Sequence, residues 1–249
     1  MMEFINTAST DDLRTLWREA FGDSEDYLDL FFGTVYSQKN CLAATIDGEL
    51  AGALYWFDCE FNSEKTAYIY AVATTKKHRG KGVCSALMAR THLYLKENGY
   101  SLAFLVPGEA SLFDFYEKMG YITCGFIDEL KLLNCNGNIQ TEKISACEYF
   151  TLRKDFEPEN SVNLIGYYEF LNSIFEFYKG ENFIFCKTKG QSFFPEFLGN
   201  NEALSPIISS MGNKSAIIRT IGNSRPFCMG ISLYNSPLKA DIYFPFAFD

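Results

Sequence analysis

The sequence is poor in the residues that build metal sites and disulfide frameworks. Its 249 residues include only two histidines, and its eight cysteines are scattered singly. No C-x-x-C pair is present, which argues against a zinc site and against a cross-linked secreted domain. We therefore expect no metal and a reduced, cytoplasmic protein whose cysteines are small core residues.

Basic residues and long apolar runs are also scarce. The chain has 22 Lys and Arg against 31 Asp and Glu, a net charge of −9. This balance opposes binding to nucleic acid or to an anionic membrane and favours a cationic substrate. No apolar segment precedes Asp11 and no run approaches the length of a membrane span, so we expect neither a signal peptide nor a membrane helix. The hydrophobic content of 47% is ample for a core.

A turn with two glycines stands between a predicted strand and a predicted helix. Residues 67–73 alternate aromatic and small apolar side chains, which suits a buried strand. The residues after the turn place an apolar stripe at helical spacing: Cys84, Leu87, Met88, Thr91 and Leu95. Residues 79–82, Arg-Gly-Lys-Gly, therefore form a strand-to-helix turn.

Such a turn can bind phosphate. Glycines let the backbone approach a ligand, and the first amides of the following helix have no partner within the helix. The helix dipole and the side chains of Arg79 and Lys81 add positive charge. We therefore predict a pyrophosphate site at residues 79–84. The alternative is a basic surface turn that binds nothing.

The motif in this turn differs from two common phosphate-binding motifs. A P-loop needs a longer glycine spacing ending in Lys-Ser or Lys-Thr, and a Rossmann turn needs G-x-G-x-x-G. The pattern Arg-x-x-Gly-x-(Gly or Ala), present as Arg79, Gly82 and Cys84, resembles the acetyl-CoA signature of the GNAT superfamily of N-acetyltransferases. Cys84 replaces the usual small residue and is little larger than alanine. The resemblance implies that acetyl-CoA contacts Val72, Ala73, Thr74, Arg79, Gly80, Lys81, Gly82, Val83, Cys84 and Ser111.

The order of predicted elements up to about residue 135 is β-αα-β-β-β-α-β-α-β. Helices begin near Thr10 and Ser24, and Asp47-Gly48 marks a hairpin between two strands. After the turn come a helix ended by residues 98–99, a strand at 101–106, a helix at 109–119 and a strand at 121–133. The GNAT fold has this order, so the resemblance implies a GNAT acetyltransferase domain over residues 1–137, an α/β fold with a mixed sheet.

The pattern changes beyond residue 134. We expect helices at 144–154, 164–178 and 202–211, and strands at 182–187, 191–198, 215–220, 227–233 and 241–248. A hairpin, a helix and a strand loosely repeat the first half, without a second Arg-x-x-Gly. We interpret residues 138–249 as a degenerate acetyltransferase-like domain. The layout resembles enhanced-intracellular-survival-type acetyltransferases without their third domain.

The resemblance also implies catalytic roles. In the family a bulge splays the strand that ends at residue 74, and exposed backbone amides polarise the acetyl carbonyl, which puts the oxyanion donor near Val72. Residues 112–121 resemble the family's helix ending in Tyr-x-Lys-x-Gly-(Phe or Tyr), in which the first tyrosine, here Tyr116, protonates the CoA sulfur. A phenol is protonated at neutral pH and can donate that proton. The alternatives are an ordinary paired strand and a core tyrosine.

The general base is the least determined residue. Among the acidic residues on the strand and turn that precede residues 67–73, we favour Glu60 as the base. The alternative is that Glu60 is a solvated surface charge. The aromatic chain end at 242–249 predicts a buried final strand, and the resemblance adds a second reading in which Asp249 and the terminal carboxylate act as the base. We expect His92 to be exposed in mid-helix, and Cys84 to be buried rather than a nucleophile.

These features together predict an enzyme, an acetyl-CoA-dependent N-acetyltransferase. It would transfer the acetyl group to a primary amine by direct attack in a ternary complex. The acidic balance permits polyamines, aminoglycoside-like amines and peptide amines as acceptors. The competing hypothesis is a non-catalytic acyl-CoA-binding or regulatory module with a protein partner, and a homo-oligomer is left open.

Overall fold

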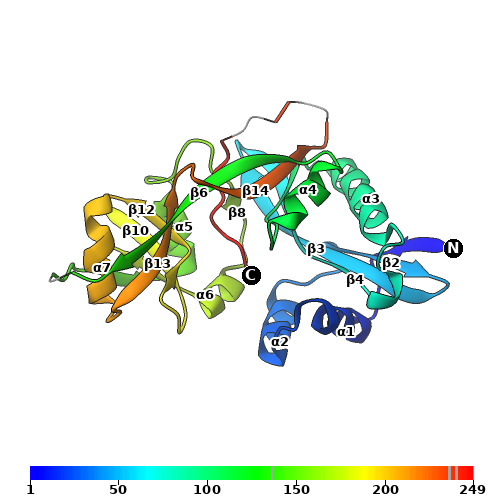
Figure 1. Cartoon of the computed structure of the whole chain (residues 1–249), viewed down its shortest axis with the longest axis horizontal. Coiled ribbons are helices and arrows are strands. Elements are labelled where there is room, and N and C mark those ends of the chain that lie inside the picture. The colour runs from blue at the N-terminus through cyan, green and yellow to red at the C-terminus, as the bar shows by residue number, and fades with distance from the viewer. Residues whose placement is uncertain (136, 235–236, 239–240, 249) are drawn as a thin grey trace. The chain divides into compact units, whose positions relative to one another are not determined.

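The computed structural model describes residues 1–135, 137–234, 237–238 and 241–248 (Figure 1). It divides into two compact units, one of Met1–Ile122 with a segment that begins at Met229, the other of Thr123–Cys228 with the chain end. The chain thus enters the second unit within strand β6 (Ile122–Leu133), earlier than the predicted boundary at 137/138. The difference arises because β6 already pairs with a later strand, β13 (Ser215–Ile221), before the polar loop is reached.

The first unit follows the predicted order of elements. Its strands lie in the order β1-β2-β3-β4-β5, with Met229–Ser232 of strand β14 beside β5. Neighbouring strands are antiparallel except for the parallel pair β4 and β5. The bounds are β1 (Met2–Ile5), α1 (Thr10–Phe21), α2 (Glu25–Thr34), β2 (Cys41–Ile46), β3 (Glu49–Phe61), β4 (Glu64–Thr74), the 3₁₀ turn η1 (Lys76–His78), α3 (Val83–Glu97), β5 (Leu102–Leu105), α4 (Ser111–Glu117) and β14 (Arg225–Ser232).

Local chemistry explains two of these boundaries. Asp47 and Gly48 both have positive φ, 52° and 83°, which is the conformation that a two-residue hairpin between β2 and β3 requires. Ser24 is the N-cap of helix α2, and its side chain accepts a hydrogen bond from the Tyr27 amide. Both features were predicted from the sequence.

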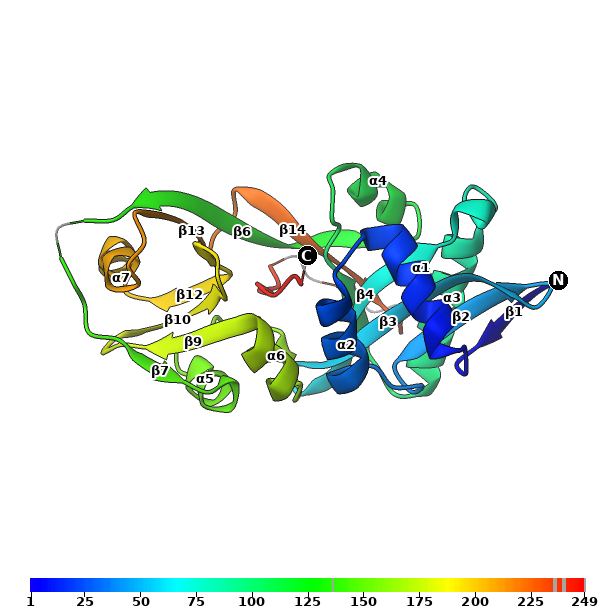
Figure 2. The same ribbon diagram turned by 90° about the horizontal axis from the view of Figure 1, so that it is seen from below.

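Alternating side chains give the first sheet two different faces. Figures 1 and 2 show α3 and α4 on one face and α1 and α2 on the other. Trp56 and Ile69 join α3 and α4 in a hydrophobic core, whereas Tyr55 and Tyr70 join an aromatic cluster around Trp17 of α1. Successive strand residues point to opposite faces of the sheet, so one set of side chains packs against α3 and α4 and the other against α1. Helices α3 and α4 carry the candidate site.

The second unit is rich in strands. One sheet has the order β12-β10-β9-β7, and β6, β13 and β11 lie side by side in that order. The elements beyond β6 are β7 (Glu142–Ile144), α5 (Ala146–Arg153), β8 (Asn163–Leu164), α6 (Tyr168–Ile174), β9 (Phe175–Lys179), β10 (Phe183–Thr188), β11 (Phe193–Phe194), β12 (Glu196–Gly199), the 3₁₀ turn η2 (Asn201–Ala203), α7 (Leu204–Ser210) and β13.

Two predictions in this unit were wrong. The helix expected at 164–178 is three short elements, β8, α6 and β9, because the run of aromatic residues at its end pairs with β10 instead of continuing the helix. The strand expected at 241–248 makes a single parallel bridge, between Ser161 and Tyr243, and is otherwise irregular. Its burial was predicted: Phe246 packs on Phe150, with ring centroids 5.5 Å apart.

A fully buried ion pair lies in this unit. The Arg153 guanidinium donates to both carboxylate oxygens of Glu196 at 2.9–3.1 Å, and neither side chain is exposed. The Tyr149 hydroxyl donates to the same carboxylate at 2.8 Å. Burial alone would lower the pKa of Arg153, but the adjacent Glu196 carboxylate raises it, so the guanidinium stays charged. Among the described residues, no helix is long and apolar enough to cross a membrane.

Candidate active site

Strand β4 carries a bulge near its carboxyl end. Pairing with β3 steps from Ala53↔Ala73 to Tyr55↔Tyr70, so two β4 residues, Ala71 and Val72, stand opposite one residue of β3. Ala71 has a φ of 49°, in the left-handed region that alanine seldom occupies. That conformation costs about 1–2 kcal/mol, and such strain is concentrated at functional sites.

The same strand parts from its other neighbour. Within the described residues, β4 pairs with β5 from Thr66↔Leu102 to Tyr68↔Phe104, while β4 itself continues to Thr74. The pairing of β4 with β5 therefore ends before the bulge, since β5 itself ends at Leu105. Backbone groups around Val72 leave the regular ladder there and can bond to a ligand.

The predicted turn follows directly. Gly80 and Gly82 have φ of 72° and 76°, and an added Cβ at either would have no heavy atom within 4 Å among the described residues. Gly82 is the N-cap of α3, and the first helical hydrogen bond runs from the Ala86 amide to its carbonyl. The amides of Val83, Cys84 and Ser85 are thus the ones that have no partner within the helix.

Positive charge surrounds these amides. Arg79 and Lys81 are exposed on the turn, and the Arg79 Nε donates to the Thr74 carbonyl at 3.3 Å, which ties the guanidinium to the end of β4. Lys76 and Lys77 precede them in η1. Two basic side chains, open glycine positions and a helix start together fit an anionic phosphate group.

Tyr116 lies in the short helix α4 and is 8% exposed. Burial raises the pKa of its phenol, and the Cys84 thiol adds to the rise, so the phenol stays protonated at neutral pH. Val72 and Cys84 pack against the same apolar cluster that contains Tyr116. The bulge, the start of α3 and Tyr116 thus border one apolar cluster, and the Cys84 thiol lies close enough to act on the Tyr116 phenol.

Other predicted site residues lie elsewhere or outside the description. Glu60 is exposed, and the residue opposite it in the β3–β4 register is Lys65. Ala71 lies six residues beyond Lys65 on β4, a distance of about 20 Å at 3.3 Å per residue. The structure does not bring Glu60 to the bulge. Ser111 is exposed at the start of α4, where its hydroxyl donates to Glu109 at 2.5 Å. Asp249 lies outside the described residues.

The expectation that His92 is exposed was wrong. Its Nε2 lies 2.8 Å from the Tyr121 hydroxyl, and burial lowers its pKa from 6.5 to about 4. The spacing of Cys84, Met88 and His92 was the missed signal, because residues four apart share one face of a helix. Cys84 itself is half-buried, and burial raises the pKa of its thiol to about 11, so the thiol is protonated.

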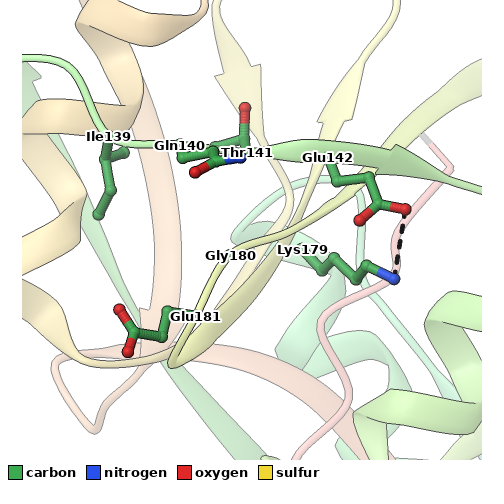
Figure 3. Close-up of a pocket in the computed structure, with 7 residues that line it drawn as sticks. All are labelled: Ile139, Gln140, Thr141, Glu142, Lys179, Gly180 and Glu181. Atoms are coloured by element: carbon green, nitrogen blue, oxygen red, sulfur yellow. Dashed lines mark ion pairs between the residues drawn. The ribbon is translucent and has the colours of Figure 1, made fainter.

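A surface cavity of about 420 Å³ lies apart from these residues, in the second unit (Figure 3). Residues 139–142 and 179–181 line it. Its cation, Lys179, is already paired with Glu142 at 3.4 Å and with Glu148 at 2.8 Å. Among the described residues, no three His, Cys, Asp or Glu side chains are placed to hold a metal.

Known proteins resemble the first part of the chain in sequence pattern. Residues 2–124 match the family model described as an acetyltransferase (GNAT) domain. None of the curated protein sequences compared with the chain matches it.

Solved acetyltransferase structures share the fold over most of the chain. A GCN5-related N-acetyltransferase from Kribbella flavida superimposes with a TM-score of 0.70 at 14% identity, over 94% of this chain and 72% of that one. A second, from Anabaena variabilis, gives 0.71 at 13% identity, over 94% and 73%. Eis1 from Mycobacterium abscessus gives 0.64 at 11% identity, over 94% and 74%. The predicted fold class is confirmed: a GNAT domain followed by a second, β-rich region.

Proposed function

We propose that this chain, whose residues 2–124 belong to the GNAT acetyltransferase family, is an acetyl-CoA-dependent N-acetyltransferase. One observation carries the proposal. Gly80 and Gly82, in the turn at 79–82, both have positive φ. They leave open space in front of the α3 amides, next to the bulged end of β4. With a pyrophosphate bound at those amides, the rest of an extended CoA molecule would run along the bulged end of β4.

Each part of the site then has a role in acetyl transfer. Val83, Cys84 and Ser85 bind the pyrophosphate through their amides, and Arg79 and Lys81 balance its charge. Val72 and its neighbours on β4 hold the acyl-pantetheine arm by backbone hydrogen bonds. Acetyl-CoA supplies the activated acetyl group when bound.

The chemical step is direct attack by a neutral amine on the thioester carbonyl. The backbone amide of Val72 donates to the carbonyl oxygen as negative charge develops there. When the C–S bond breaks, the Tyr116 hydroxyl donates its proton to the departing thiolate, and the pKa raised by burial keeps that proton available at neutral pH. The attacking nitrogen loses its extra proton to solvent water, and a proton from water restores the Tyr116 phenol, so the products are the N-acetyl amine and CoA.

The acceptor is a primary amine. The net charge of −9 attracts a cationic substrate from solution, which is consistent with polyamines, aminoglycosides or lysine-containing peptides. Thiol release from acetyl-CoA with spermidine, kanamycin and a lysyl peptide tests the activity. The proposal expects release that depends on at least one of these amines. No amine-dependent release with any of the three would contradict it.

The cofactor site has its own test, the change Gly82→Glu. It adds bulk and negative charge where the pyrophosphate is expected, so calorimetry should show loss of acetyl-CoA binding. Gly22→Glu is the matched control, because Gly22 ends α1 with a φ of 74° and an equally open Cβ position. Unchanged affinity in Gly82→Glu, or equal loss in both variants, would contradict the assignment.

A further inference from the structure

The end of helix α4 folds back on Tyr116. Gly120 has a φ of 92°, and the next amide, from Tyr121, donates to the Tyr116 carbonyl at 3.2 Å. This reversal packs the ring of Tyr121 edge-to-face against that of Tyr116, with centroids 5.8 Å apart and planes at 62°. Such an aromatic pair contributes a defined geometry in addition to apolar burial.

Tyr121 in turn is held from helix α3. It is 1% exposed, and its hydroxyl lies 2.8 Å from the Nε2 of His92. The two rings also contact each other, with centroids 5.5 Å apart. A buried hydroxyl without a partner is costly, so this hydrogen bond fixes the position of the Tyr121 hydroxyl and the depth of its side chain in the core.

His92 therefore connects two parts of the site. It lies two helical turns after Cys84, on the same helix whose first amides are assigned to the pyrophosphate. Through Tyr121, that helix also supports the ring of Tyr116. A chain of direct contacts runs from α3 through Tyr121 to the phenol assigned as the acid.

We infer that His92 and Tyr121 are positioning residues that hold the Tyr116 phenol in the orientation needed to protonate the CoA thiolate. The inference rests on the proposed function, because it presupposes the role of Tyr116. Burial favours the neutral forms of all three groups, raising the pKa of both phenols and lowering that of the imidazole to about 4. Neutral groups of this kind orient a neighbour by hydrogen bonding and packing and take no proton from it at neutral pH.

The test uses acetyl-CoA with the most active amine of the panel and compares single variants of His92, Tyr116 and Tyr121 and one double variant. Tyr121→Phe and His92→Leu remove the hydrogen bond, and we expect each to lower kcat about tenfold while the KM for acetyl-CoA changes little, because a misplaced acid affects the chemical step. His92→Gln keeps a polar group near Nε2 and should recover most of kcat. In a Tyr116→Phe background, Tyr121→Phe should cause no further loss, since one effect acts through the other.

Tyr100→Phe is the matched control. Tyr100 is 5% exposed in the same core, but its hydroxyl donates to Asp58 at 2.5 Å, near the start of β5 rather than at Tyr116. It should lose stability without losing kcat. A purely structural role predicts instead that Tyr121→Phe and Tyr100→Phe behave alike, and this result would overturn the inference.

The outcomes separate the two proposals. Normal turnover in Tyr116→Phe would overturn the acid role and the inference with it. Reduced turnover in Tyr116→Phe together with normal kcat in Tyr121→Phe and His92→Leu would overturn the inference alone. If His92→Leu fails to fold, Tyr121→Phe and His92→Gln carry the test, and equal kcat in both would overturn the inference.

Discussion

Acid should destabilise the first unit through His92. The imidazole has a pKa near 6.5 when unfolded and about 4 when folded, where burial disfavours its charged form. Between those values the unfolded chain binds a proton that the folded chain does not. The stabilisation from neutral His92 is therefore complete above pH 6.5 and is lost as the pH falls towards 4.

The size of the effect follows from the two pKa values. Each pH unit below 6.5 removes about 1.36 kcal/mol, so the loss is about 2 kcal/mol at pH 5 and about 3 kcal/mol at pH 4. Carboxyl groups titrate in the same pH range. Comparing the wild type with a variant that lacks only the imidazole cancels their contribution to the loss of stability. His92→Gln is that variant, because glutamine does not titrate.

Urea unfolding followed by tryptophan fluorescence measures the effect. Both tryptophans, Trp17 and Trp56, are about 1% exposed in the unit that contains His92, so fluorescence reports on that unit. Between pH 7.5 and pH 5 the wild type should lose about 2 kcal/mol more than His92→Gln. Equal losses would show that His92 titrates normally and would refute the buried contact with Tyr121.

Other changes test the second unit and the turn. Phe246→Ala should lower the free energy of unfolding by about 3–5 kcal/mol, measured by urea unfolding with circular dichroism, because Phe246 is fully buried; a change below about 1 kcal/mol would contradict its placement. Arg153→Leu should cost about 3–5 kcal/mol because it leaves the fully buried Glu196 carboxylate without the Arg153 cation, whereas replacing both residues by leucine should cost less; equal costs would contradict the pairing. Gly82→Ala, which adds strain without charge, should weaken acetyl-CoA binding in calorimetry far less than Gly82→Glu, and equal weakening would indicate a distorted backbone instead of a blocked site.

The first unit was largely predictable from the sequence because its signals are local. Asp47-Gly48 specifies a hairpin by its backbone preferences, and the apolar stripe from Cys84 to Leu95 specifies α3 by its spacing. The turn at 79–82 required only that glycine permits positive φ. These features involve residues close together in the chain, so tertiary contacts were not needed to infer them.

The remaining features depend on long-range contacts. The division of the chain could not be inferred because Met229–Ser232 pairs with Leu102–Leu105, more than 100 residues away in sequence. The aromatic run at 175–178 suits either a helix or a strand, and pairing with β10 decides for the strand. Ala71 is an ordinary residue in the sequence, and only the pairing of β3 with β4 shows its positive φ.

The kcat of Tyr116→Phe tests the central claim most directly. The change removes one hydroxyl from a buried ring and leaves the turn at 79–84 untouched, so acetyl-CoA affinity should stay within about twofold while kcat falls by about 10²–10⁴, the usual effect of losing a general acid. Single-turnover measurements with acetyl-CoA and the best amine of the panel would separate the chemical step from product release. A kcat equal to that of the wild type would show that Tyr116 is a packing residue and would contradict the account.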